Sequence, residues 1–163
     1  MEIREAIIED AASIVQVMQD AEASGYMLFA PGERQMTVQE MQTFVEKMPK
    51  LPSSAFIVAN NPDVIGYMMI KGERLIRTSH RASIAIGVHS KSRGQGVGQA
   101  LITYAIEWAK QKGLHRLELT VIAHNERAIH LYEKLGFEVE GVKRDALYID
   151  GVFVDELYMS KLL

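Results

Sequence analysis

Three glycines alternate with other residues in Arg93-Gly94-Gln95-Gly96-Val97-Gly98, which joins a strand-like run, Arg81–His89, to a helix-like run, Gly98–Lys112. Glycine has no β-carbon, so backbone N–H groups can crowd together at the start of the helix, where the helix dipole favours an anion. The segment therefore predicts a cradle for a pyrophosphate group, to which Arg93 would add a bidentate contact. A merely flexible turn is the alternative interpretation.

Two other phosphate-binding motifs do not fit this segment. The dinucleotide spacing G-x-G-x-x-G fails because Gln99 occupies the position of its last glycine. The P-loop spacing fails because no Gly-Lys-Ser/Thr follows. The pattern thus excludes the common dinucleotide enzymes and nucleoside triphosphatases.

The runs on either side of this segment predict a sheet. After the helix, Leu114–Ile122 is a β-rich run, and a strand, a crossover helix and a second strand place the two strands parallel. Earlier in the chain, Ala55–Asn60 and Val64–Lys71 flank Asn60-Asn61-Pro62-Asp63, whose residue types favour a hairpin turn. We therefore expect a mixed α/β sheet with both parallel and antiparallel neighbours.

The two ends of the chain supply further elements. At the N-terminal end the sequence predicts a strand at Ile3–Ile7, a helix capped by Asp10 and ended by Gly25, a loop over Tyr26–Arg34, and a helix from the capping box of Thr37 and Glu40 to Met48. At the C-terminal end it predicts a helix from Asn125 to Leu135, followed by strands at Phe137–Tyr148 and Val152–Leu162 that turn at Asp150-Gly151. No linker, repeat or low-complexity tract divides them. One domain over residues 1–163 is the simplest account.

Composition narrows the possible function classes. The 163 residues are 48% hydrophobic and 24% charged, which is ordinary for one globular domain with a core. The net charge of -3 supplies no positive field to attract nucleic acid or anionic lipid, and the lack of cysteine excludes disulfides and thiolate catalysis. The start of the chain is too charged for a signal peptide, and no apolar run approaches the roughly 18 residues of a membrane span. We expect a cytoplasmic protein with no nucleic-acid or membrane partner.

Two motifs in order resemble the GNAT family of acetyl-CoA-dependent N-acetyltransferases. They are Arg93-x-x-Gly96-x-Gly98 and, after the next strand, Asn125-x-x-Ala128-x-x-Leu131-Tyr132-x-x-x-Gly136-Phe137. More weakly, Arg77-Thr78-Ser79-His80 and Gly151-x-x-x-Asp155-Glu156-Leu157-Tyr158-Met159 resemble a bacterial subgroup that includes amino-acid N-acyltransferases and relatives of ribosomal-protein acetylating enzymes. The resemblance is strong over Ile84–Val142, and the N-terminal half agrees in element order.

The resemblance implies a fold and a donor. The fold would be a mixed central sheet of about seven strands with about four helices, in which the strands bearing Val88 and Val121 splay apart. Acetyl-CoA, the acyl donor, would lie in that gap and bond the backbone edge at Gly87, Val88 and His89. The amide of Val88 would stabilise the oxyanion formed when an amine attacks the thioester.

The same resemblance assigns roles to residues of the second motif. Tyr132 would protonate the departing thiolate as a general acid, although its spacing from Ala128 and Leu135 also fits a core aromatic. Asn125 and Ala128 would contact the cofactor arm, and Asn125 is also a good helix N-cap.

The general base is open. Many relatives place a Glu on the strand between Ser79 and Ser90, but this chain has no acid there. Glu118 is the nearest carboxylate, and a surface ion pair with Arg116 is an equal alternative. His80, His89 and ordered water are the other options.

The functional expectation is transfer of acetyl from acetyl-CoA to a primary amine of a small molecule or amino acid, without a covalent enzyme intermediate. A protein N-terminus of the ribosomal type is the alternative acceptor, and a non-catalytic acyl-CoA-binding regulator is the alternative of another class. The five histidines show no metal-ligand spacing, so no metal is expected. The last hairpin leaves a homodimer open.

Overall fold

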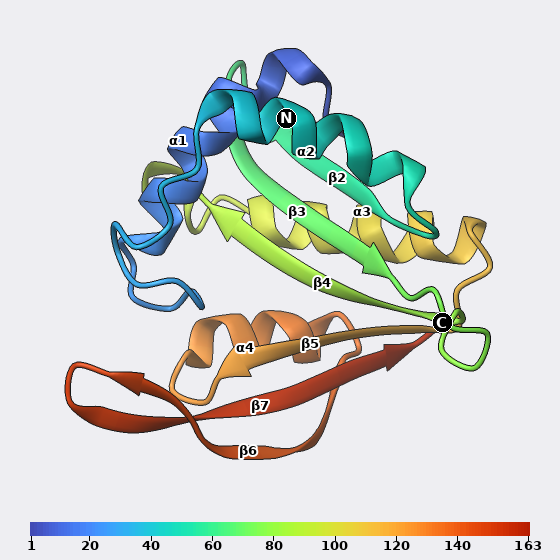
Figure 1. The fold of residues 1–163 in the computed structure, drawn as a ribbon. Helices are drawn as coiled ribbons and strands as arrows, with labels where there is room; N and C mark the ends of the chain where they lie inside the picture. The colour runs from blue at the N-terminus through green and yellow to red at the C-terminus, as the bar shows by residue number, and fades with distance from the viewer.

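The computed structural model describes residues 1–163 as one seven-stranded sheet in the order β1-β2-β3-β4-β5-β7-β6 (Figure 1). The strands are β1 (Glu2–Glu5), β2 (Ala55–Asn60), β3 (Val64–Gly72), β4 (Arg81–Val88), β5 (Arg116–Ile122), β6 (Glu138–Ile149) and β7 (Val152–Leu162). β4 and β5 are parallel, and every other neighbouring pair is antiparallel. The predicted mixed sheet with one parallel pair is confirmed.

Four α-helices connect the strands, and the sequence predicted each of them to within a few residues. They are α1 (Ala11–Glu22), α2 (Val38–Lys47), α3 (Val97–Gln111) and α4 (Glu126–Lys134), with short 3-10 turns at Ile8–Asp10, Met48–Lys50 and Ser90–Ser92. The capping box of α2 is confirmed: Thr37 Oγ1 accepts from the N–H of Glu40 at 3.1 Å, and Glu40 Oε2 accepts from the N–H of Thr37 at 2.8 Å. None of the helices combines the length and apolar character needed to cross a membrane.

The prediction that Asp10 caps α1 is wrong. Asp10 precedes the helix, but its carboxylate bonds no N–H of α1. It accepts two hydrogen bonds from Arg4, at 2.7 and 2.9 Å, and one from the N–H of Ile7 at 2.9 Å. Burial disfavours the charged carboxylate, but the bonds from Arg4 and Ile7 outweigh it and lower the pKa of Asp10. The residue therefore fixes β1 to the turn before the helix.

Helices cover both faces of the first half of the sheet. Side chains that alternate along β2 face opposite ways, so Phe56 and Val58 join the cluster under α1 and α2, while Ile57 joins the larger cluster under α3. In Figure 1, α1 and α2 lie on the near side of β2 and β3, and α3 lies behind them. This packing holds β1 to β4 rigidly on one side of the parallel pair.

The parallel pair is short. Only Arg81, Ala82 and Ser83 of β4 pair with β5, opposite Arg116, Leu117 and Glu118. Beyond these residues the two strands diverge, as Figure 1 shows, and β5 continues with β7 as its partner to Ile122. The sheet is thus continuous at one end and open at the other.

Candidate active site

The open end of the parallel pair exposes backbone groups of β4. His89 donates its N–H to Ile65 on β3 at 2.9 Å, and the carbonyl of His80 accepts from Arg116 at 3.2 Å. Backbone groups alternate in direction along a strand, so even-numbered residues of β4 face β5. Ile86 and Val88 therefore direct N–H and C=O groups, and Ile84 its C=O group, toward a gap where no strand meets them.

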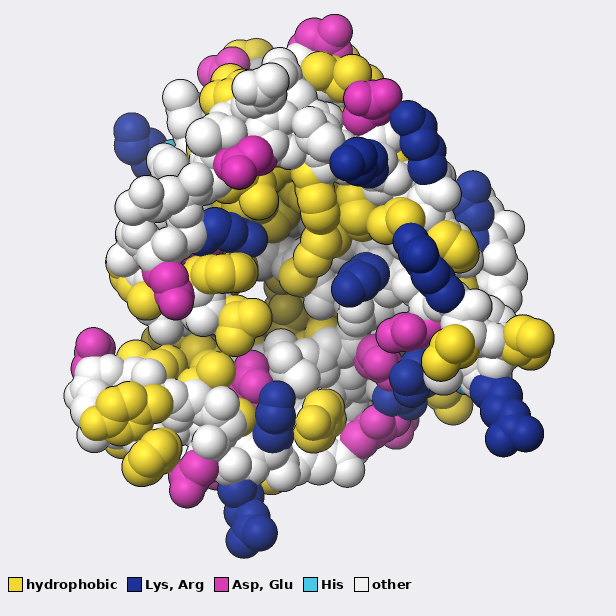
Figure 2. Space-filling view, viewed as in Figure 1, with side chains coloured by type: hydrophobic (Ala, Val, Ile, Leu, Met, Phe, Trp, Pro, Cys, Tyr) yellow, Lys and Arg dark blue, Asp and Glu magenta, His cyan; other side chains and the backbone are white.

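A cavity of about 640 Å³ occupies this gap. Its walls come from both parted strands, the β4–α3 turn, α4, the loop after α1 and the last hairpin. Figure 2 shows the hollow between the upper and lower parts of the molecule, with apolar side chains on its walls. Segments far apart in the chain thus meet around one space.

The N-terminus of α3 opens onto this cavity without a side-chain cap. Gly96 stands at the N-cap with φ of 80°, a left-handed conformation that favours glycine, and offers no capping side chain. The N–H of Ala100 bonds the Gly96 carbonyl at 3.0 Å, so the N–H groups of Val97, Gly98 and Gln99 precede the first helical bond. A β-carbon on Gly98 would lie 3.1 Å from Leu131 Cδ2. Free donors and a close approach are what an anion cradle needs.

Arg93 is engaged by groups of the protein. Its Nε donates to the carbonyl of Val88 at 3.2 Å, and its Nη2 lies 3.8 Å from Asp20 Oδ2 on α1. The predicted bidentate contact with a pyrophosphate would require Arg93 to give up these contacts within the protein. The guanidinium instead covers the end of β4 that faces the gap.

Asp20 ties α1 to the turn before the cradle, which the sequence did not suggest. Its carboxylate accepts from the N–H and Oγ of Ser90, at 2.5 and 2.8 Å. Burial disfavours the charged form, but these bonds outweigh it and lower the pKa of Asp20. No local pattern links residues 70 positions apart.

Of Gly87, Val88 and His89, which the resemblance places against the donor, Val88 alone directs its backbone into the gap. The N–H of His89 is bonded to β3, as described above. Gly87 also lies in the register that faces β3, and a β-carbon on it would lie 2.4 Å from the ring of Tyr67. The glycine is therefore required by packing against Tyr67, while it also lines the cavity.

Tyr132 lines the cavity from α4 and is 7% exposed. Its ring lies 5.8 Å from that of Phe137, and its hydroxyl makes no hydrogen bond with another residue. Burial raises the pKa of Tyr132 to about 12, so the hydroxyl keeps its proton across the neutral range. At the start of the same helix, Asn125 accepts from the N–H of Ala128 at 3.3 Å, which confirms the predicted N-cap, and both residues line the cavity.

These features agree with known proteins. A model of the acetyltransferase (GNAT) family matches residues 16–137, which is most of the chain. The chain belongs to the GNAT family. L-amino acid N-acetyltransferase AaaT of Escherichia coli (strain K12) is 36% identical over 104 residues, 61% of this chain and 62% of that protein. The ribosomal protein uS5-alanine N-acetyltransferase of the same organism is 32% identical over 79 residues, 48% of this chain and 41% of that protein.

A solved acetyltransferase of the GNAT family from Streptococcus pneumoniae has the same fold. It superposes with a TM-score of 0.93 at 31% identity, over 99% of each chain. The matches to the two curated relatives, by contrast, span less than two thirds of their lengths. The GNAT fold is therefore shared along the whole chain.

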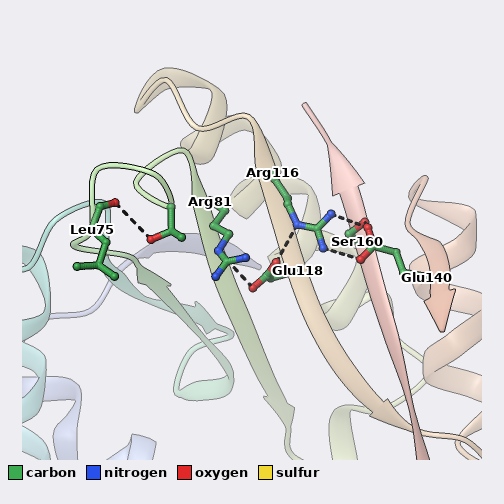
Figure 3. A network of polar contacts seen from close by, with 7 residues as sticks. Leu75, Arg81, Arg116, Glu118, Glu140 and Ser160 are labelled. Atoms are coloured by element: carbon green, nitrogen blue, oxygen red, sulfur yellow. Dashed lines mark hydrogen bonds and ion pairs between the residues drawn. The ribbon is translucent and has the colours of Figure 1, made fainter. Parts of the chain in front are cut away.

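Glu118, the carboxylate that the sequence offered as a base in this GNAT chain, does not line the cavity. It lies at the closed end of the parallel pair, where Arg116 Nε donates to it at 2.8 Å and Arg81 Nε lies 3.9 Å away. Figure 3 shows it within a network that continues through Arg116 to Glu140 and Ser160. The structure therefore places Glu118 in an ion pair with Arg116, which was the alternative to a role as the general base.

Neither histidine candidate lines the cavity either. His80 precedes β4 at the closed end, with its ring 6.4 Å from that of His115. His89 Nδ1 accepts from the N–H of Lys91 at 3.2 Å, and its Nε2 lies 3.8 Å from Asp20. The cavity is lined instead by a histidine and a glutamate that the sequence did not single out as site residues, His124 and Glu156.

The sequence contained little that could have identified His124 and Glu156 as residues of the cavity wall. His124 lies in the turn after β5, where its ring is 5.7 Å from that of Tyr26. Glu156 falls within the weaker motif near the C-terminus, but its position beside the gap depends on its pairing with Ile122 of β5. That pairing joins residues 34 positions apart in sequence, which no local period shows.

Proposed function

We propose that this chain transfers an acetyl group from acetyl-CoA directly to a primary amine of a small molecule or amino acid. The observation that carries the proposal is one cavity lined by the parted β4–β5 pair, the uncapped N-terminus of α3 and the largely buried side chain of Tyr132. Family membership supports the reaction class. Acetyl-CoA, when bound, supplies an activated thioester.

The residues present fit that donor. The N–H groups of Val97, Gly98 and Gln99 would hold its pyrophosphate, because they lack helical partners and point along the positive end of the helix dipole. The backbone edge of β4 at Ile86 and Val88 would bond the amides of its arm, as an added strand does. For this, the Arg93 guanidinium has to leave the Val88 carbonyl, to which it donates at 3.2 Å.

Two groups of this chain would then promote the transfer. The N–H of Val88 would stabilise the negative charge that develops on the carbonyl oxygen, with no reorganisation at the moment of reaction. Tyr132 holds a proton at its Oη because burial raises its pKa to about 12. We propose that this proton goes to the departing sulfur, whose thiol has an ordinary pKa of about 8.5.

The walls on the acceptor side favour a small molecule with an apolar part. Tyr26, Met27 and Leu28 line the cavity from the loop after α1, and Leu147 lines it from β6. These apolar side chains line the cavity from both sides of the gap. A protein N-terminus is the alternative acceptor, and it is the acceptor that the name of the uS5 relative states for that protein.

A thiol-release assay tests the proposal. Acetyl-CoA is offered with a panel of amino acids, amino-acid amides, alkylamines, polyamines and short peptides. Release with small amines supports the proposal, and release with peptides alone favours the protein acceptor. Acetyl-CoA binding by calorimetry without release for any amine would favour a non-catalytic acyl-CoA-binding regulator.

A further inference from the structure

Glu156 is a buried carboxylate beside the open end of the parallel pair. It lies on β7, where it pairs with Ile122 at the end of β5, and it lines the cavity. The residue is 8% exposed. The other carboxylate of the cavity wall, Glu126, is exposed in the first turn of α4. Glu156 is thus the one acid held in the wall away from bulk water.

The carboxylate of Glu156 has almost no partner within the protein. No donor hydrogen-bonds to it, and its one ion pair is with Lys143 Nζ at 3.7 Å, from a lysine side chain that is 48% exposed. A buried charge without hydrogen bonds is costly, so native proteins pair such groups. The cavity is the direction from which a further partner can come.

A cation that donates hydrogen bonds is the partner that suits this carboxylate. The other titratable groups of the cavity wall are Tyr26, Arg93, His124, Glu126, Arg127 and Tyr132. Arg93 lies against Val88 and Asp20. Glu156 therefore has room for a ligand ammonium group, which would bring three donors to the carboxylate.

Other carboxylates and histidines are worse placed for this role. Glu118 is bonded to Arg116 at the closed end, and neither His80 nor His89 lines the cavity. His124 lines the cavity but is exposed. Among these carboxylates and histidines, only Glu156 is both buried and part of the cavity wall.

We propose that Glu156 binds the ammonium group of the acceptor and removes its proton, an assignment that rests on the proposed function. Its carboxylate accepts one proton from the ammonium and frees the nitrogen lone pair for attack on the carbonyl carbon. The C–N bond forms and the C–S bond breaks, and the departing sulfur takes the proton of Tyr132. The nitrogen then loses a second proton, which restores the Tyr132 hydroxyl. The ammonium and the thioester together give an amide, a free thiol and one proton, which Glu156 passes to solvent.

The experiment compares Glu156→Gln with wild type and with Lys143→Gln, using acetyl-CoA and either phenethylamine or leucine amide between pH 7 and 10. Glu156→Gln is expected to lower kcat/KM for the amine about 100-fold or more at pH 7, because general-base catalysis contributes roughly that much. The loss should shrink about tenfold per pH unit, as free amine replaces ammonium, until the pH reaches the pKa of the amine. It should also be smaller for leucine amide, whose amine has a pKa near 8, than for phenethylamine, an alkylamine with a pKa near 10.

Lys143→Gln is the matched control, because it breaks the same ion pair and leaves the carboxylate in place. It should retain activity within about threefold, and both variants should bind acetyl-CoA as wild type does by calorimetry. If Glu156→Gln does not fold by circular dichroism, Glu156→Asp takes its place, with a loss of about tenfold expected from the retracted carboxylate.

Three results would overturn the assignment: activity of Glu156→Gln within threefold of wild type at pH 7, a loss that stays constant with pH, or an equal loss in Lys143→Gln. If wild type uses neither probe but uses another panel amine, the comparison is made with that amine. Absence of release by wild type with every amine would overturn the proposed function itself, and the wild-type data alone distinguish that case.

Discussion

The closed end of the β4–β5 pair, around Arg116 and Glu118, and its open end, around Val88 and Ile122, belong to the same two strands, but the carboxylates beside the two ends are bonded differently. At the closed end Arg116 donates to Glu118 and to both oxygens of Glu140. At the open end the β4 edge faces a cavity, and Glu156 has no hydrogen-bond donor.

The difference separates carboxylates that are bonded within the protein from a carboxylate that is left open to a ligand. Native proteins bond most of their buried polar groups, so a buried group without a partner needs an explanation. A ligand that completes the missing bonds is one such explanation. Changes at the open end should therefore affect activity, and changes at the closed end should affect stability.

The largest effect is expected at the open end for Tyr132→Phe. Loss of the proton donor should lower kcat about 100- to 1,000-fold while acetyl-CoA affinity stays within about threefold. Stability should be preserved, because the hydroxyl that is removed has no hydrogen-bond partner. Stopped thiol-release assays and calorimetry measure the two quantities. Tyr104→Phe on α3 is the matched control, and equal losses in both variants would contradict the acid role.

Gly98→Leu should have the next largest effect. Its β-carbon would lie 3.1 Å from Leu131 and 3.8 Å from Ile86, so the added side chain must enter the cradle or displace α4. Overpacking of this kind weakens an interaction by about 1–3 kcal/mol, so acetyl-CoA affinity should fall about 10- to 100-fold by calorimetry. Gly141→Leu, at a glycine with open space around it, should bind normally. Unchanged binding by Gly98→Leu would argue against the cradle.

At the closed end, Arg116→Met should reduce stability and spare catalysis. The variant removes the hydrogen bonds from Arg116 to Glu118 and Glu140, and Glu140 keeps the bond from Ser160. Partial exposure of the two carboxylates limits the loss to about 1–2 kcal/mol. The Tm should fall by roughly 2–8 °C, as measured by circular dichroism. A loss of turnover without a change in Tm would contradict the division between the two ends.

The same network predicts how stability changes in acid. Hydrogen bonds from Arg116 and Ser160 lower the pKa of Glu140 to about 2, so its contribution is complete above the unfolded pKa of about 4.5 and is lost as pH falls from 4.5 to 2. The Glu140 side chain is 43% exposed, so screening holds this contribution below about 1 kcal/mol. Urea unfolding of wild type and Glu140→Gln at pH 7 and pH 3 measures it. The two proteins should converge at the lower pH.

The smallest effect on activity is expected for Glu118→Gln. Glu118 lies outside the cavity in an ion pair, so kcat/KM should remain within about threefold of wild type in the thiol-release assay. This result would sharpen the contrast with Glu156→Gln. A loss of 100-fold would instead show that a carboxylate of the closed end takes part in the reaction.

Local patterns predicted most of the fold. The capping box at Thr37, the turn at Asn60-Asn61-Pro62-Asp63 and the helix cap at Asn125 each depend on residues close in sequence, and the structure contains all three. Asp10 shows the limit of such patterns. Its position fitted a helix cap, but the guanidinium of Arg4 on the neighbouring strand competes for the same carboxylate and binds it.

The candidate site also contains residues that local sequence patterns could predict and residues that they could not. The glycine cradle and Tyr132 belong to contiguous motifs and could be predicted from them. The partners of Arg93 could not, because Asp20 comes from α1, far away in sequence. Glu118 and Glu156 are both glutamates in β-rich runs, and only cross-strand register distinguishes the one at the closed end from the one at the gap.

By itself, the sequence determined the elements, their order, the parallel pair and the family, because backbone geometry, capping and hydrophobic period act over a few residues. The tertiary structure decided where the parallel pair stops, which carboxylate faces the cavity and which arginine is already engaged. Those outcomes depend on contacts between distant segments, and the charge state of a buried group depends on all the segments that surround it.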